Sequence, residues 1–203
     1  MPAYAAPIEV IQAALHRIGE EELPSLDGDD SAARVANSNY EGIVRAAFTR
    51  HAWTFAKQTL PVTYQSAVEL GPYRHAWVAP SEVINIQYLM YRGQRLRSGD
   101  YAIESGRILT RDRYEGATLQ VVANVRAHES VWPGDLSEAI VTRLQALFLE
   151  ALCDKPQDAR LKERDADQKM RDAILRDKRQ EPGVDVLTSA PLAEAWRRRR
   201  GRC

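Results

Sequence analysis

Residues able to carry acid–base or metal chemistry are scattered along this chain of 203 residues. The four histidines, His16, His51, His75 and His128, belong to no H-E-x-x-H or comparable metal-ligand spacing. The sequence also lacks a G-x-S-x-G motif, a phosphate-binding loop and a dinucleotide fingerprint. We therefore expect no catalytic residue, no metal and no cofactor, and we expect that the protein is not an enzyme.

One catalytic alternative stays open on numbers alone, because the chain has 28 acidic residues. Glycoside hydrolysis needs two carboxylates that flank the scissile bond, and many pairs could be chosen here. No spacing in the sequence singles out one of these pairs, so we assign no residue to that chemistry.

Basic residues are concentrated near the end of the sequence, where Arg197, Arg198, Arg199, Arg200 and Arg202 lie together. Without these five, 23 basic residues face 28 acidic ones, a net charge of −5 over residues 1–196. Three interpretations are open: a solvated end, a nucleic-acid patch with strong salt dependence, or a docking arm whose arginines pair with carboxylates of a partner. Leu192 and Trp196 precede the arginines and are four residues apart, and a tryptophan is costly to leave in water. This favours a docking arm formed by Leu192, Trp196 and Arg197 to Arg200, alone or with a contact to DNA.

Helical periodicity predicts three amphipathic helices, over residues 7–18, 31–50 and 136–153. Between them, residues 60–125 change to a period of two with turn residues, which is typical of antiparallel strands. Tyr101 to Ile103 and Arg107 to Leu109 flank Glu104-Ser105-Gly106 and predict a hairpin. Strands of this kind between helices indicate an α+β protein.

Residues 157–180 predict a further helix that is highly charged. Its apolar stripe is thin, comprising Ala159, Ala166, Met170, Ala173 and Ile174. A helix this polar is typical of a solvated arm or of packing on one neighbour. We expect an α+β fold that is mainly an α-helical bundle, with a small β-sheet insertion and a long C-terminal helical arm.

Aromatic residues stand at the ends of the predicted elements. We expect Trp53, Phe55, Trp77 and Trp132 to close the core between helices and sheet, and a ligand-binding box is the weaker alternative.

Five short segments, taken in order, resemble the head-to-tail adaptor family of tailed bacteriophages, which includes the tail tubular protein A type. The resemblance spans roughly residues 8–153 and depends on order and spacing, since no single motif is sharp. The segments are His16-Arg17-Ile18-Gly19, Ser25-Leu26-Asp27, Asn39-Tyr40, His51-Ala52-Trp53-Thr54-Phe55-Ala56 and Tyr101 to Thr110.

The resemblance implies a structural virion protein, assembled in the host cytoplasm, that joins the DNA-filled head to the tail. It implies a homo-oligomeric ring of twelve copies below the portal protein, with a tail, tail-tube or nozzle protein underneath and a contact with packaged DNA in the channel as a further possibility. No apolar run approaches membrane-spanning length, so we expect no membrane partner. Residues 1–153 would form the adaptor body, with Tyr40, Trp53 and Phe55 at its core or interface. Residues 154–203 would form the charged helix and a portal-docking arm.

Two alternatives from other classes accompany this expectation. The first is a DNA-binding accessory protein that uses the arginine cluster, although a net charge of zero and the lack of a recognition fold count against it. The second is a virion enzyme that degrades the cell wall, an activity attributed to some members of the adaptor family. The matched segments provide no residue for it.

Overall fold

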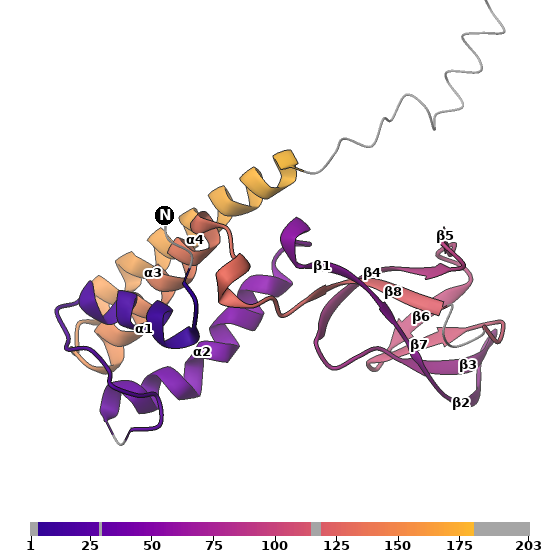
Figure 1. Cartoon of the computed structure of the whole chain (residues 1–203), viewed down its shortest axis with the longest axis horizontal. Helices are drawn as coiled ribbons and strands as arrows, with labels where there is room; N and C mark the ends of the chain where they lie inside the picture. Colours follow the sequence, from indigo (N-terminus) through magenta and orange to yellow (C-terminus); the bar gives the residue numbers. More distant parts are fainter. Residues whose placement is uncertain (1–3, 29, 115–118, 181–203) are drawn as a thin grey trace, which may run out of the picture.

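The computed structural model describes residues 4–28, 30–114 and 119–180, which form a helical part and a β part side by side (Figure 1). We define the helical part as residues 4–56 and 126–180, and the β part as residues 57–125. The longer helices of the helical part are α1 (Pro7–His16), α2 (Ser31–Thr49), α3 (Gly134–Ala151) and α4 (Pro156–Gln180). Two short 3-10 turns, η1 (Thr54–Ala56) and η3 (Glu129–Val131), lie where the two parts join.

The strands of the β part are all paired antiparallel in two sheets. The first sheet has the order β1-β8-β4-β5 and the second has the order β2-β3-β7-β6. Their bounds are β1 (Lys57–Pro61), β2 (Thr63–Leu70), β3 (Tyr73–Val78), β4 (Val83–Tyr91), β5 (Gln94–Arg95), β6 (Tyr101–Glu104), β7 (Arg107–Thr110) and β8 (Leu119–Val125).

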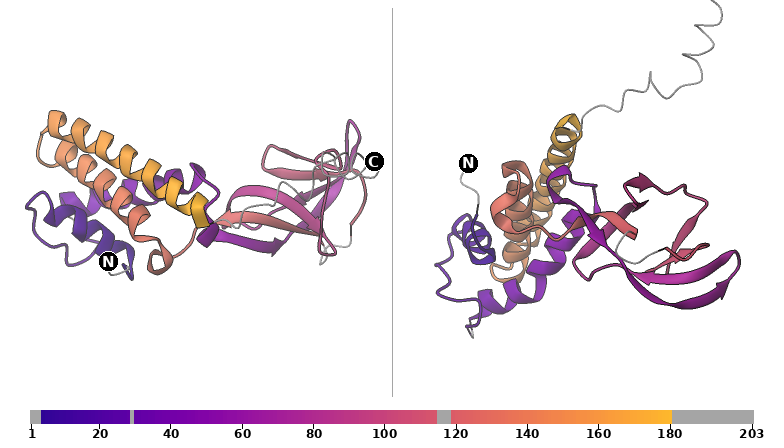
Figure 2. Two further views of the ribbon diagram at one scale, coloured as in Figure 1. Left: turned by 90° about the horizontal axis from the view of Figure 1, so that it is seen from above. Right: turned by 45° about the vertical axis from the view of Figure 1, so that its right-hand side comes forward.

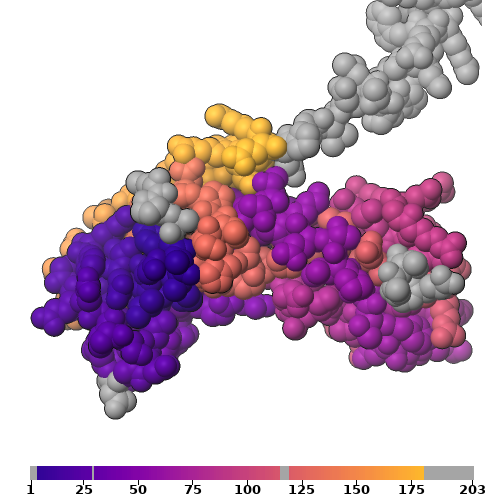
Figure 3. Space-filling model, in the orientation of Figure 1, coloured from indigo at the N-terminus to yellow at the C-terminus, as the bar shows by residue number. Residues whose placement is uncertain are grey.

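Each part has its own hydrophobic core. The helical core collects the apolar faces of α1, α2 and α3, and Phe48 lies at its centre with Trp132 at a ring-centroid distance of 6.0 Å. The β core lies between the two sheets and contains Trp77, Leu89 and Ile108, all fully buried or nearly so. The space-filling view accordingly shows two lobes with a narrower connection (Figure 3).

The expectation that four aromatic residues close one core was therefore wrong for one of them. Trp53 and Trp132 are buried in the helical core, and Phe55 packs against it half-buried. Trp77 belongs to the β core, where its indole Nε1 donates to the hydroxyl of Thr110 at 2.9 Å.

The predicted hairpin at residues 101–109 is present as β6 and β7. Glu104 and Arg107 are register partners, and the two residues between them, Ser105 and Gly106, have φ of 50° and 74°. Two positive φ values in a two-residue loop define the turn whose twist matches the strands, and this explains the glycine at position 106.

The chain leaves the helical part at η1 and returns to it after β8. The strand that follows η1 is β1, and β1 and β8 are neighbours in the first sheet, with Lys57 opposite Asn124. The whole β part is thus an insertion between α2 and α3 whose two ends lie side by side (Figure 1).

The expected mainly helical bundle with a small sheet insertion was wrong. Within the described residues there are two antiparallel sheets of four strands each, so the fold is α+β with a substantial β part. The strand β2 explains the error, because most of its residues are exposed and its sequence lacks a regular apolar alternation. Trp77 and Ile108 belong to a second core that is assembled from several short strands, and none of these strands alone indicates such a core.

The expected long C-terminal helical arm also needs correction, because α4 is not a free arm. It lies along α3 in both views of Figure 2, where the two helices run as adjacent rods. Ala159, Ala166 and Ala173 are buried in this contact together with Met170. Small side chains let two helix axes approach closely, so the thin apolar stripe of α4 is sufficient for packing.

Candidate functional site

A buried polar cluster joins α2 to the segment between β8 and α3. Glu129, only 2% exposed, accepts a hydrogen bond from the Tyr40 hydroxyl at 2.8 Å and one from Arg126 Nη2 at 2.6 Å. Arg126 also reaches Glu41 at 3.2 Å and lies over the Trp132 ring at 5.3 Å. A buried carboxylate is tolerated when such donors satisfy it, and this cluster provides two.

These contacts change the acidity of both partners. Burial would raise the pKa of Glu129, but the hydrogen bonds from Arg126 and Tyr40, with the charge of Arg126, together hold the pKa below its ordinary value. Burial raises the pKa of Tyr40 above the ordinary range, and the adjacent Glu129 adds to this effect. The cluster therefore keeps Glu129 ionised and Tyr40 neutral at physiological pH.

A second buried cluster lies at the far end of α4. Asp177 is 4% exposed and accepts hydrogen bonds from the backbone N–H of Thr54 at 3.0 Å and from the Thr54 hydroxyl at 2.6 Å. His51 Nε2 lies 2.9 Å from Oδ2 of the same carboxylate, the oxygen that also accepts from the Thr54 N–H, and the imidazole packs edge-on against Trp53. The last turns of α4 are thereby fixed to the segment that leads into the β part.

This second cluster continues into the first sheet. Asn124, buried in β8, donates from Nδ2 to the carbonyl of His51 at 2.9 Å. Its Oδ1 accepts from Gln87 of β4, also at 2.9 Å. Hydrogen bonds thus run from α4 across the joint to the middle of the sheet, and they leave these buried polar atoms satisfied.

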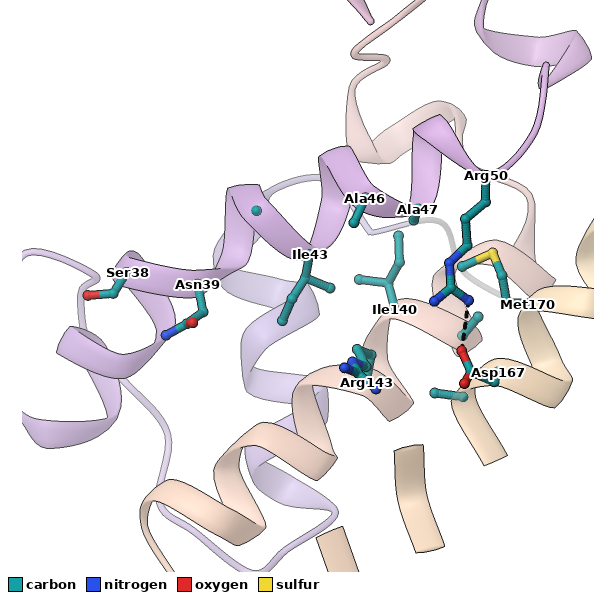
Figure 4. A pocket seen from close by; sticks show the side chains of 13 residues that line it. Ser38, Asn39, Ile43, Ala46, Ala47, Arg50, Ile140, Arg143, Asp167 and Met170 are labelled. Carbon is teal, nitrogen blue, oxygen red and sulfur yellow. Dashed lines mark hydrogen bonds and ion pairs between the residues drawn. The ribbon is translucent and has the colours of Figure 1, made fainter. Parts of the chain in front are cut away.

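A groove of about 280 Å³ lies between α2, α3 and α4 in the helical part. Its apolar floor is formed by Ile43, Ile140 and Met170. The small residues Gly42 and Ala46 of α2 also line the groove and leave space open beside the helix. Figure 4 shows these side chains from close by, with Ile43 and Ile140 pointing toward one another across the gap. We call this hollow the helical groove.

Ion pairs border the helical groove. Arg50 reaches across from the end of α2 to Asp167 of α4 at 2.7 Å, as the dashed line in Figure 4 shows. Arg143 of α3 pairs with Glu163 of α4 at 3.0 Å. The groove thus combines an apolar floor with a rim that carries both signs of charge, which suits a short amphipathic peptide segment better than a charged cofactor.

An acidic hollow lies between the loop that follows α1, the start of α2 and the end of α3. Glu20, Glu21, Glu22 and Asp30 contribute to its lining, and Glu22 pairs with His16 at 3.2 Å. Across the described ranges, no group of three or more His, Cys, Asp or Glu side chains is placed to hold a metal ion.

The histidines have structural partners. Beyond His51 and His16, His75 Nδ1 lies 3.5 Å from the Tyr64 hydroxyl and His128 Nδ1 lies 3.0 Å from the Ser130 hydroxyl. None of these pairs includes a base held by a third group toward a nucleophile, as acyl transfer needs. We therefore assign none of these histidines to catalysis.

The residues predicted from the sequence fall in two places. Tyr40 and Trp53 are buried and Phe55 is half-buried, all three in or against the helical core. The predicted docking residues, Leu192, Trp196, Arg197, Arg198, Arg199 and Arg200, lie outside the described residues.

Sequence reasoning missed the two buried carboxylates. Glu129 and Asp177 are two of 28 acidic residues, and their burial depends on partners more than 85 positions away. Nothing in the local sequence distinguishes Asp177 from the exposed charged residues next to it in the same helix.

Comparison with protein-family models finds no match to this chain, and neither does comparison with curated proteins. Among the described residues, no helix is both long and apolar enough to cross a membrane.

Proposed function

We propose that this chain is a structural subunit of a phage head-to-tail adaptor, which assembles as a ring against the portal protein. The observation that carries the proposal is the use of the reactive side chains as internal fastenings. Two side-chain contacts join the helices to the segments that enter and leave the β part: Tyr40 with Glu129, and His51 with Asp177.

The resemblance segments support the same proposal. Residues 51–56 form the joint between the two parts, and residues 101–110 form the β6–β7 hairpin. Tyr40 anchors the joint from α2 through Glu129. A subunit that transmits load between two neighbours needs such a joint, whereas an enzyme needs accessible reactive groups.

The attachment would be made by the arm. Leu192 and Trp196 would insert into a groove of the portal, with Arg197 to Arg200 pairing with acidic groups around it. The helical part and the β part would form the ring wall, and the family implies twelve copies.

The test is the binding of the full chain to the portal protein of the same virus, followed by light scattering and electron microscopy. We expect a ring on the portal. Trp196→Ala should weaken attachment by roughly 30-fold, the typical loss for an anchor worth about 2 kcal/mol. Val186→Ala, which shortens an apolar side chain of the same segment outside Leu192 to Trp196, is the matched control and should change attachment by less than about threefold.

A variant without residues 184–203 should remain folded and lose stable attachment. If that variant assembles on the portal as the full chain does, the arm does not make the joint. If the full chain stays monomeric with portal at all concentrations, the proposal fails entirely. Salt-titrated DNA binding, measured with and without residues 197–203, tests the DNA-binding alternative, because equal affinity of the two proteins for DNA would remove it.

A further inference from the structure

The helical groove is an apolar surface within reach of an apolar segment of the same chain. We propose that in the free protein the segment Pro191 to Trp196 folds back and occupies the helical groove of its own chain. This inference concerns the chain before any assembly, so it holds or fails independently of the proposed role in a ring.

The location of the groove supports this assignment. Ala166, Asp167 and Met170 of α4 line the groove, and α4 runs on to Gln180. The part of α4 between Met170 and Gln180 is about 15 Å long at the helical rise. The chain from Gly183 to Trp196 spans up to about 45 Å when extended, so the return path is well within its reach.

The sequence directly after α4 favours a reversal of direction. Pro182-Gly183 follows Glu181, and a Pro-Gly pair is typical of a tight turn in which proline presets φ and glycine adopts a positive φ. A turn there would direct the following residues back along α4 toward the groove.

The chemistry of the segment matches that of the groove. Leu192 and Trp196 are one helical turn apart and would meet the floor of Ile43, Ile140 and Met170. Glu194 and the following arginines carry both signs of charge, as does the rim with Arg50–Asp167 and Arg143–Glu163. A groove of about 280 Å³ has room for one or two large side chains and is small for a cofactor.

The chain's own segment is favoured over that of a second copy. A tethered segment has an effective concentration in the millimolar range, which exceeds any ordinary protein concentration. A partner that takes Leu192 and Trp196 must therefore compete with the groove, and the docked segment would keep free copies from attaching prematurely.

Acrylamide quenching of tryptophan fluorescence gives the first test, because the chain contains four tryptophans and three of them are shielded. Trp53, Trp77 and Trp132 are at most 3% exposed, so quenchable emission of the full chain reports mainly Trp196. We expect weak quenching in the native chain. Ala46→Leu fills the groove from an exposed position of α2 and should raise the quenching constant about threefold or more toward that of free tryptophan.

Disulfide trapping gives the second test and uses the cysteine at position 203. In a Cys153→Ser background, Ser38→Cys places a thiol at the end of the groove, and Ser66→Cys places one on the exposed surface of β2 as the matched control. We expect Ser38→Cys to form an intramolecular disulfide with Cys203 at least about tenfold faster than Ser66→Cys does. Trp196→Ala should remove this difference.

Equal trapping rates for the two cysteines would overturn the proposal, and so would strong quenching of Trp196 in the native chain. Disulfides that join two chains in place of one would show that the groove receives the segment of a second copy, which also overturns it. Circular dichroism of each variant identifies any that fails to fold, and the quenching measurement on the native chain needs no variant.

Discussion

The carboxylate of Asp177 accepts two hydrogen bonds from Thr54, one from the backbone N–H at 3.0 Å and one from the hydroxyl at 2.6 Å. Asp177 lies in the last turn of α4, where the helix dipole disfavours a negative charge. The donors of Thr54 and the adjacent His51 offset this disadvantage, so the residue's position is explained by the joint that it forms and not by the helix.

Replacing Asp177 by alanine should therefore lower stability considerably. Asp177→Ala leaves the half-buried donors of Thr54 without this acceptor, and we expect the free energy of unfolding to fall by about 2–4 kcal/mol. Asp172→Ala, an exposed aspartate of the same helix, is the matched control and should change it by less than about 0.5 kcal/mol. Urea denaturation of the native chain and the two variants measures both losses of unfolding free energy. Equal losses would show that Asp177 does not stabilise the joint more than an exposed aspartate does.

The hydroxyl of Tyr40 should contribute to stability through Glu129. Tyr40→Phe removes one donor from a carboxylate that is 2% exposed, and we expect a loss of about 1–2 kcal/mol in the free energy of unfolding. Tyr73→Phe at the half-buried start of β3 is the control for loss of a hydroxyl. If the two variants unfold at the same urea concentration, the hydrogen bond to Glu129 contributes nothing.

Acid should destabilise the protein through the lowered pKa of Glu129. The pKa of Glu129 in the folded protein lies below its ordinary value of 4.5. Between these two pKa values the unfolded chain binds more protons than the folded one, so the free energy of unfolding rises with pH. Glu138 has a lowered pKa for a similar reason, chiefly its hydrogen bond from Arg17. Stability from both groups is complete above pH 4.5 and is lost as the pH falls through their folded pKa values.

Melting temperatures measured between pH 7 and pH 3 check this expectation. Glu129→Gln has no carboxyl to titrate at this position, so its melting temperature should fall less steeply below pH 5 than that of the native chain. Tyr40→Phe keeps the carboxyl but loses one donor, and it should give an intermediate slope. Identical slopes in all three proteins would show that Glu129 does not have a lowered pKa.

The β6–β7 turn depends on the glycine at position 106. Its φ of 74° lies in the left-handed region, where a side chain is strained, so Gly106→Ala should lower the free energy of unfolding by about 1 kcal/mol. Gly42 of α2 is a control of the opposite sign, since an added Cβ there has no atom within 4 Å. Gly42→Ala should stabilise the chain by about 0.5–1 kcal/mol, because alanine favours a helix more than glycine does.

The elements with strong periodicity could be predicted from the sequence, and those without it could not. The apolar faces of α1, α2 and α3 placed these helices within two residues of their observed ends. The hairpin at residues 101–109 followed from its Ser-Gly turn. The second sheet could not be predicted, because β2 exposes most of its residues and its partners come from separate short strands.

The candidate site was largely hidden from sequence reasoning. The apolar stripe of α4 was recognised, but whether alanines such as Ala166 face solvent or another helix depends on the helices packed beside α4. The charges of α4 also pair across helices, as Asp167 does with Arg50 and Arg176 with Asp135. Spacing within α4 cannot reveal such partners, because they come from distant segments of the chain.

The neighbouring positions of Lys57 and Asn124 have an evolutionary consequence. Because the β part begins and ends at adjacent strands, its two chain connections to the helices lie close together, and a side chain of β4, Ile84, also packs against the helical core. A lineage could exchange this insertion for another fold, or lengthen its hairpins, without repacking Phe48 and its neighbours. Distant relatives should accordingly keep the helical framework and the residues of the joint, while their insertions diverge in size and sequence.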